Sequence, residues 1–190
     1  MHTLFYGGTY MKNLLKTLPI ILYPYMYMLC FVGFYITMKK SSNPTELFFT
    51  LIIILLVLAV VFNLYSFITA IRILISASKG KYSAAQLAKL NMTVKLVHIP
   101  AYIIHFCLAI LGFFLSVWGI PVILWTIFID LVTISLSGIV GIGANIRAKK
   151  ENRISAGRSV LYSILGFVYC VDVVVSIILN RKVKKEPISQ

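Results

Sequence analysis

Residues 47–75 read LFFTLIIILLVLAVVFNLYSFITAIRILI, and this stretch decides the fold class. It holds one charged residue, Arg72, in a run long enough to cross a bilayer as an α-helix. The rest of the chain has the same character. Hydrophobic residues make up 60% of it and charged residues 12%, against about 45–50% and about 25% in soluble domains. We therefore expect an all-α fold, a polytopic transmembrane helix bundle.

Five apolar runs are candidate spans, separated by polar, glycine-containing or proline-containing breakers. They cover residues 20–38, 47–75, 83–117 or only 101–117, 121–146, and 157–179. We expect residues 1–19 to form a cytoplasmic N-terminal segment, with Met11 as an alternative start to Met1. Residues 20–179 are expected to form one transmembrane helical domain, and residues 180–190 a basic C-terminal tail.

Charge predicts the orientation. The chain has 18 Lys and Arg against 5 Asp and Glu, and basic loops stay in the cytoplasm. The loops around residues 79–89 and 147–158 are therefore expected inside, with the N-terminus, and the uncharged turn 116–121 outside. Five spans put the basic tail outside, which leaves ten basic residues inside and six outside. An alternative with four spans and one re-entrant run brings the tail inside.

The same charges indicate partners. Lys and Arg loops attract anionic lipid headgroups, so we expect the bilayer itself, other membrane proteins or a second copy of the chain as partners, and no nucleic acid. The three cysteines, Cys30, Cys107 and Cys170, lie in separate apolar runs without CxxC spacing. They predict small packing residues and no disulfide framework.

The third run carries a polar stripe. Ser83 and Gln86 have the spacing of a capping box, which predicts a helix beginning there. Steps of 4, 3, 4 and 3 residues then place five polar side chains on one helical face: Asn91, Lys95, His98, Tyr102 and His105. This face is a candidate ligand or proton site.

Pro100 interrupts that run and removes one helical hydrogen bond. One interpretation is a kinked span. The other is a bend between an interfacial helix, 83–99, and a span, 101–117. We favour the bend, because it keeps Lys89 and Lys95 near the headgroups.

Two carboxyls, Asp130 and Asp172, lie within the fourth and fifth runs. Charges inside a membrane normally face the bundle and pair with a partner. At about 1.5 Å per residue, His105, Asp130 and Asp172 lie roughly 11–16 Å from the outer ends of their helices. We expect the three to meet, either as a proton or cation site or as a structural cluster that fixes helix register. Two histidines seven residues apart without a cysteine predict no metal site, and no cofactor is expected.

The fourth run also has small residues at steps of four, which allow close approach of a second helix. These are Thr133, Ser137 and Gly141, followed by Asn145. We expect them, with Pro100 in the third run, to shape helix packing.

Three segments, KLNMTVKLVHIPAYIIHF (89–106), NLYSFITAI (63–71) and VYCVDVVVS (168–176), carry a resemblance. The chain resembles an uncharacterised family of small multi-span bacterial membrane proteins. The resemblance implies a location in the bacterial cytoplasmic membrane and no known activity.

Three functions remain open at this point. The first is an accessory, regulatory or partner-binding membrane subunit without enzymatic activity, and the second a small ion- or proton-coupled transporter or channel using the Asp and His side chains. The third is a membrane-embedded lipid-modifying enzyme with His98 or His105 as a base. A water-accessible cavity at the polar residues favours the last two, and a dry core in which they pair favours the first.

Overall fold

The computed structural model describes residues 14–40 and 44–184, and all the regular elements in those ranges are helical. This confirms the all-α class for the described residues. Their order along the chain is α2 (Leu18–Lys40), α3 (Pro44–Ser78), α4 (Ala84–Phe114), the 3-10 turn η1 (Ser116–Gly119), α5 (Ile120–Lys150), α6 (Ala156–Leu165) and α7 (Val171–Lys184).

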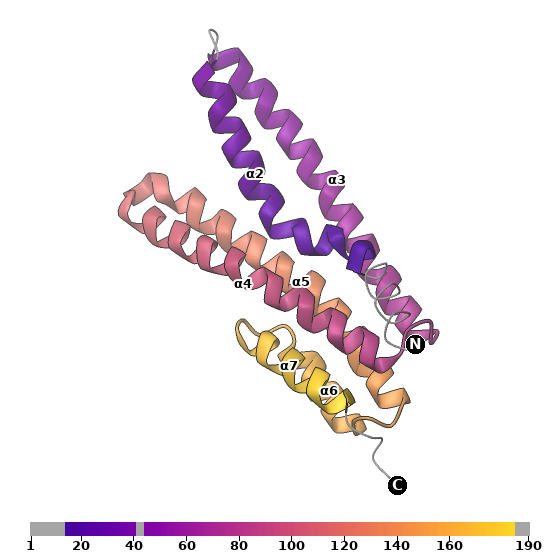
Figure 1. Cartoon of the computed structure of the whole chain (residues 1–190). Coiled ribbons are helices and arrows are strands. Elements are labelled where there is room, and N and C mark those ends of the chain that lie inside the picture. The colour runs from indigo at the N-terminus through magenta and orange to yellow at the C-terminus, as the bar shows by residue number, and fades with distance from the viewer. Residues whose placement is uncertain (1–13, 41–43, 185–190) are drawn as a thin grey trace, which may run out of the picture.

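The helices form three antiparallel hairpins. The α4–α5 hairpin lies between the other two, with α2–α3 on one side and the short α6–α7 pair on the other (Figure 1). α5 packs against both α4 and α3, α7 packs on α4, and α6 packs on α5. Toward its Lys40–Pro44 end, α2–α3 diverges from α4–α5 (Figure 1). The core sits along α4 and α5, and buried side chains of α2, the end of α3 and α7 pack against it.

α4 begins where the capping box was predicted. The Ser83 hydroxyl accepts a hydrogen bond from the Gln86 amide, and the Gln86 side chain accepts one from the Ser83 amide. The helix then continues through Pro100 to Phe114, so the favoured division at Pro100 into two pieces does not occur. Near the proline, which leaves the Leu96 carbonyl without its helical donor, the Tyr25 hydroxyl donates to the neighbouring carbonyl of Val97.

Among the residues that the structure describes, three helices are long and apolar enough to cross a membrane, fewer than the five that were predicted. They are Phe49–Ser78, Ala84–Phe114 and Ile120–Lys150. α2 has 23 residues, and its apolar segment with described side chains is Leu18–Leu29.

The predicted fifth span, 157–179, is wrong as a single helix. It is divided into α6, with 10 residues, and α7, with 14, which at about 1.5 Å per residue are too short for a 30 Å core. Gly166 ends α6, and Cys170, with φ of +65°, precedes α7. The chain reverses direction between them (Figure 1).

The pattern of side-chain exposure is the reverse of that in a water-soluble bundle, because apolar side chains face outward and polar ones face inward. The middle of α3 exposes its apolar side chains; Ile53, Val57 and Val61 are 61%, 57% and 59% exposed. On α4 the apolar Ile103 and Phe106 are exposed as well. The polar stripe of α4 faces inward, where it meets α5 and α7.

Candidate functional site

The polar stripe of α4 is buried along its whole length. Asn91, Lys95, His98, Tyr102 and His105 are each at most 7% exposed. The prediction that they share one face is confirmed. Because buried polar groups are costly without hydrogen bonds, their partners determine what this face can do.

Lys95 is the centre of the stripe and is only 1% exposed. Its ammonium donates to Asp172 Oδ2 at 2.8 Å, to the carbonyl of Gly166 at 3.0 Å and to the hydroxyl of Ser137 at 3.4 Å. A lysine has three N–H donors, so the set is complete. Its acceptors come from α7, the end of α6 and α5. Lys95 therefore connects four helices through one side chain.

His105 and Asp130 form a second pair, nearer the η1 end of α4–α5. Nδ1 of His105 lies 2.6 Å from Asp130 Oδ1. The His105 side chain is 2% exposed and that of Asp130 is 16% exposed. This contact joins α4 to α5. The expectation that Asp172 meets these two residues is wrong: Asp172 pairs with Lys95, because the turn at 166–170 places the start of α7 beside the middle of α4.

Tyr102 lies between the two pairs. It interacts electrostatically with both Asp172 and Asp130, and its ring contacts the ring of Tyr169 with centroids 5.1 Å apart. Among the described residues, the Tyr102 hydroxyl, Asp172 Oδ1 and His98 Nδ1 are buried without a hydrogen-bond partner. Buried polar atoms with unused hydrogen-bonding capacity therefore lie between the Lys95–Asp172 and His105–Asp130 pairs.

His98 faces α2. Its Nε2 lies 3.0 Å from the carbonyl oxygen of Ile20, and the residue is fully buried. A histidine held in this way orients a neighbouring helix. It has no open approach for a substrate, which weighs against its use as a catalytic base.

The small residues of α5 lie inside the bundle. Thr133, Ser137 and Gly141 are buried, and a Cβ added to Gly141 would lie 3.3 Å from the Asn91 side chain of α4. A Cβ on the neighbouring Gly138 would come within 2.6 Å of the Phe167 ring. Gly141 therefore allows α4 to approach α5 closely, and Gly138 allows the turn between α6 and α7 to do the same.

A further polar cluster lies outside the residues that the sequence analysis singled out. Asn63 of α3 donates to the hydroxyls of Tyr23, at 2.8 Å, and Tyr27, at 3.3 Å. The available signal was the spacing of Tyr23 and Tyr27, four residues apart and so on one helical face. The cluster ties α2 to α3.

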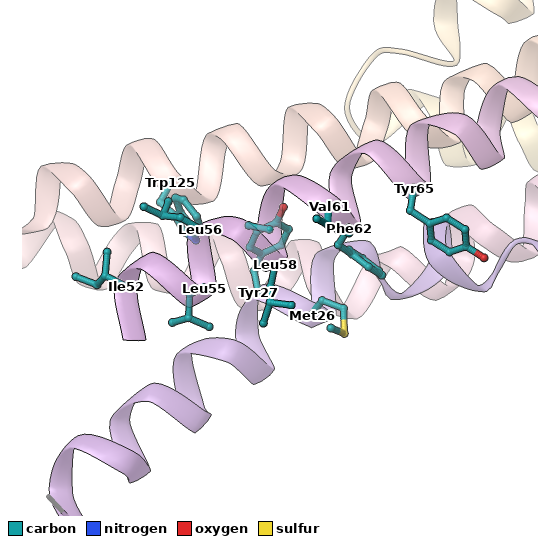
Figure 2. Close-up of a pocket in the computed structure, with 11 residues that line it drawn as sticks. Met26, Tyr27, Ile52, Leu55, Leu56, Leu58, Val61, Phe62, Tyr65 and Trp125 are labelled. Carbon is teal, nitrogen blue, oxygen red and sulfur yellow. The ribbon is translucent and has the colours of Figure 1, made fainter. Parts of the chain in front are cut away.

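An apolar groove lies at this same hairpin. It has a volume of about 480 Å³ and is lined by α2, α3 and Trp125 of α5. Figure 2 shows Leu55, Leu56, Phe62 and Met26 around it. Neither the Lys95–Asp172 pair nor the His105–Asp130 pair lines it.

Metal binding finds no support in the described part of the chain. No three His, Cys, Asp or Glu side chains there lie close enough together to hold a metal ion. Cys107 and Cys170 are both exposed and unpaired.

The described part of the chain is thus all-helical, with three helices suited to a membrane and ionisable side chains paired in its core. The chain belongs to the family of unknown function DUF6652, whose profile matches residues 12–185. This confirms the expected relation to an uncharacterised family. No curated protein and no solved structure matches the chain.

Proposed function

We propose that this protein is a multi-pass membrane protein of the bacterial cytoplasmic membrane that acts as a partner-binding or regulatory subunit and is not an enzyme. One observation carries the proposal. The buried charges of the core bond to one another and to the main chain, whereas the long outer helix α3 presents apolar side chains to its surroundings. A core of this kind favours stability and helix register over solute passage.

The topology we propose has four spans, α2 to α5, followed by a re-entrant hairpin, α6–α7. The short lengths of α6 and α7 and the Lys95 contacts at their turn support it. This arrangement moves the four basic residues of the tail to the inner side. The tally then changes from ten against six to fourteen against two, in closer agreement with the positive-inside rule.

A photo-crosslinking experiment tests the partner-binding role. A benzophenone amino acid at position 53, 57 or 61 of α3 is irradiated in native membranes, with position 103 of α4 as an exposed control. We expect discrete crosslinked protein species from α3 and only lipid adducts from position 103. Lipid adducts alone from all four positions would contradict a partner at α3.

A proton-coupled transporter is the second candidate, supported by the partial exposure of Asp130 and the unpartnered atoms between the two pairs. Proton flux across liposomes that contain the purified protein and a pH-sensitive dye distinguishes a transporter from the partner-binding subunit. We expect the wild-type protein and Asp130→Asn to show the same proton leak as empty liposomes. A flux that Asp130→Asn abolishes would replace the subunit role with transport.

A lipid-modifying enzyme is the least supported function. His98 is fully buried against Ile20, and His105 is held by Asp130. Neither histidine lines the apolar grooves at the α2–α3 hairpin.

A further inference from the structure

A groove with a volume of about 900 Å³ runs between the last turns of α5 and the whole length of α6, away from the polar core. The α5 wall consists of Ile142, Ile146, Lys149 and Lys150. The α6 wall includes Gly157, Val160 and Ile164 and ends at Phe167. Because α5 and α6 are antiparallel, the two walls of the groove begin together at the 150–156 loop and extend away from it.

The two ends of the groove differ in polarity. Its mouth has Lys149, Lys150 and Asn152, while its inner end has Ile142, Ile164 and Phe167. From Gly157 to Phe167 the helical rise amounts to roughly 15 Å. An occupant that matches both ends has a negatively charged head and an extended apolar chain.

No acidic side chain lines the groove. The nearest carboxylate in sequence, Glu151, accepts from Arg147 Nε at 2.8 Å and from the amide of Ala84 at 3.0 Å. It is therefore engaged elsewhere and leaves the lysines at the mouth without a counter-charge from this residue. The Lys150 ammonium donates to the carbonyl of Ser78 at 2.9 Å and keeps further N–H donors.

The start of α6 adds to the positive potential at the mouth. Ser155 caps the helix, and Ala156 and Gly157 of its first turn line the groove. The N-terminus of a helix carries a partial positive charge that favours phosphate. Gly157 also leaves the mouth open, because a Cβ placed on it would meet no atom within 4 Å.

From this geometry we propose that the α5–α6 groove binds an anionic phospholipid. The phosphate lies at Lys149 and the first turn of α6, and one acyl chain extends between the helices to Phe167. The site rests on the membrane insertion included in the proposed function. Basic pockets between helices at the cytoplasmic face bind anionic lipid heads in the same manner.

Native mass spectrometry of the full-length protein in detergent tests this site, with phosphatidylglycerol and phosphatidylcholine of identical chains as the probes. Lys149→Gln removes one charge at the mouth, and Gly157→Phe fills the groove. The matched controls are Lys81→Gln, an exposed lysine of the 79–83 loop, and Gly157→Ala.

We expect the wild-type protein to retain phosphatidylglycerol in preference to phosphatidylcholine. Lys149→Gln is expected to weaken phosphatidylglycerol binding about fivefold, which corresponds to one basic side chain at a membrane surface. Gly157→Phe should remove the bound lipid, and the two controls should behave as the wild-type protein does.

Two results would overturn the site. Equal retention of the two lipids would indicate unselective coating of the surface, and an equal loss in Lys81→Gln and Lys149→Gln would indicate general attraction by the basic loops. A carbonate wash of membranes separates this failure from that of the proposed function. Protein that the wash releases contradicts membrane insertion itself, whereas retained protein without lipid preference contradicts the groove alone.

Discussion

At the scale of single residues, Lys95 matters most. A buried ammonium is tolerated only when its donors are satisfied, and here α5, α6 and α7 each supply one acceptor. The Gly166 carbonyl among them belongs to the C-terminal end of α6, where the main chain lacks helical partners. Lys95 therefore holds the α6–α7 turn in place.

Removal of one member of the pair is expected to be costly. Lys95→Leu leaves Asp172 buried without its cation, and Asp172→Leu leaves Lys95 without its anion. Each should destabilise the protein by about 3–5 kcal/mol, or about 10 °C in the midpoint of thermal unfolding. The double variant should recover most of this loss, because an apolar pair of similar volume needs no charge partner.

Thermal unfolding in detergent measures all three variants, with Lys81→Leu as an exposed-lysine control that should change the midpoint by a degree or two at most. A double variant as unstable as the sum of the single ones would mean that Lys95 and Asp172 are not energetically coupled.

The stripe shows how far sequence reasoning reaches at this scale. Steps of three and four residues were enough to predict that Lys95 and His105 share one helical face, which the structure buries. They were not enough to predict partners. Lys95 was expected near headgroups because a bend at Pro100 was favoured, and Asp172 was expected beside His105 because residues 157–179 were predicted as one helix. The position of Asp172 is set by the turn at 166–170 and not by helical periodicity.

At the scale of elements, the α4–α5 hairpin depends on a tight turn. Gly112 at the end of α4 and Gly119 at the start of α5 approach so closely that a Cβ on Gly119 would overlap the Gly112 carbonyl. Since this neighbour is backbone, a side chain at 119 must displace the turn. The two helices that hold the His105–Asp130 pair are therefore closed by a glycine contact.

Gly119→Ala is accordingly expected to lower the thermal unfolding midpoint by several degrees and to loosen the His105–Asp130 contact. Gly157→Ala is the matched change at an open glycine and should be neutral or slightly stabilising, by up to about 1 kcal/mol. The same unfolding assay compares them. Equal midpoints for the two variants would show that the turn yields without cost.

The length of an apolar run predicts α3, α4 and α5 well but does not reveal a reversal inside such a run. Residues 157–179 are apolar enough to read as one span, yet Gly166 and Cys170 turn the chain back. Cysteine has no special preference for positive φ, so Cys170 gives no strong turn signal in the sequence. The reversal follows from tertiary contacts, above all Phe167 against Gly138 and Lys95 against Gly166.

At the scale of the whole molecule, polar and apolar groups are separated both across the bundle and along its helices. Charged pairs lie inside the bundle, and apolar side chains lie outside along α3 and α4. Along the helices, the loops 79–83 and 151–155 and the end of α7 lie at one end of the α4–α5 hairpin (Figure 1). Glu151, bonded to Ala84, and Lys150, bonded to Ser78, join the first two of these segments.

Cysteine accessibility in intact cells tests the central claim, the re-entrant α6–α7 hairpin, most directly. The native cysteines are replaced, and single cysteines are placed at positions 40, 80, 150 and 184. Four spans and a re-entrant hairpin predict that a membrane-impermeant maleimide labels position 40 from outside, and that positions 80, 150 and 184 react only after permeabilisation. Labelling of position 184 in intact cells, with 80 and 150 still protected, would contradict the hairpin and restore a fifth span.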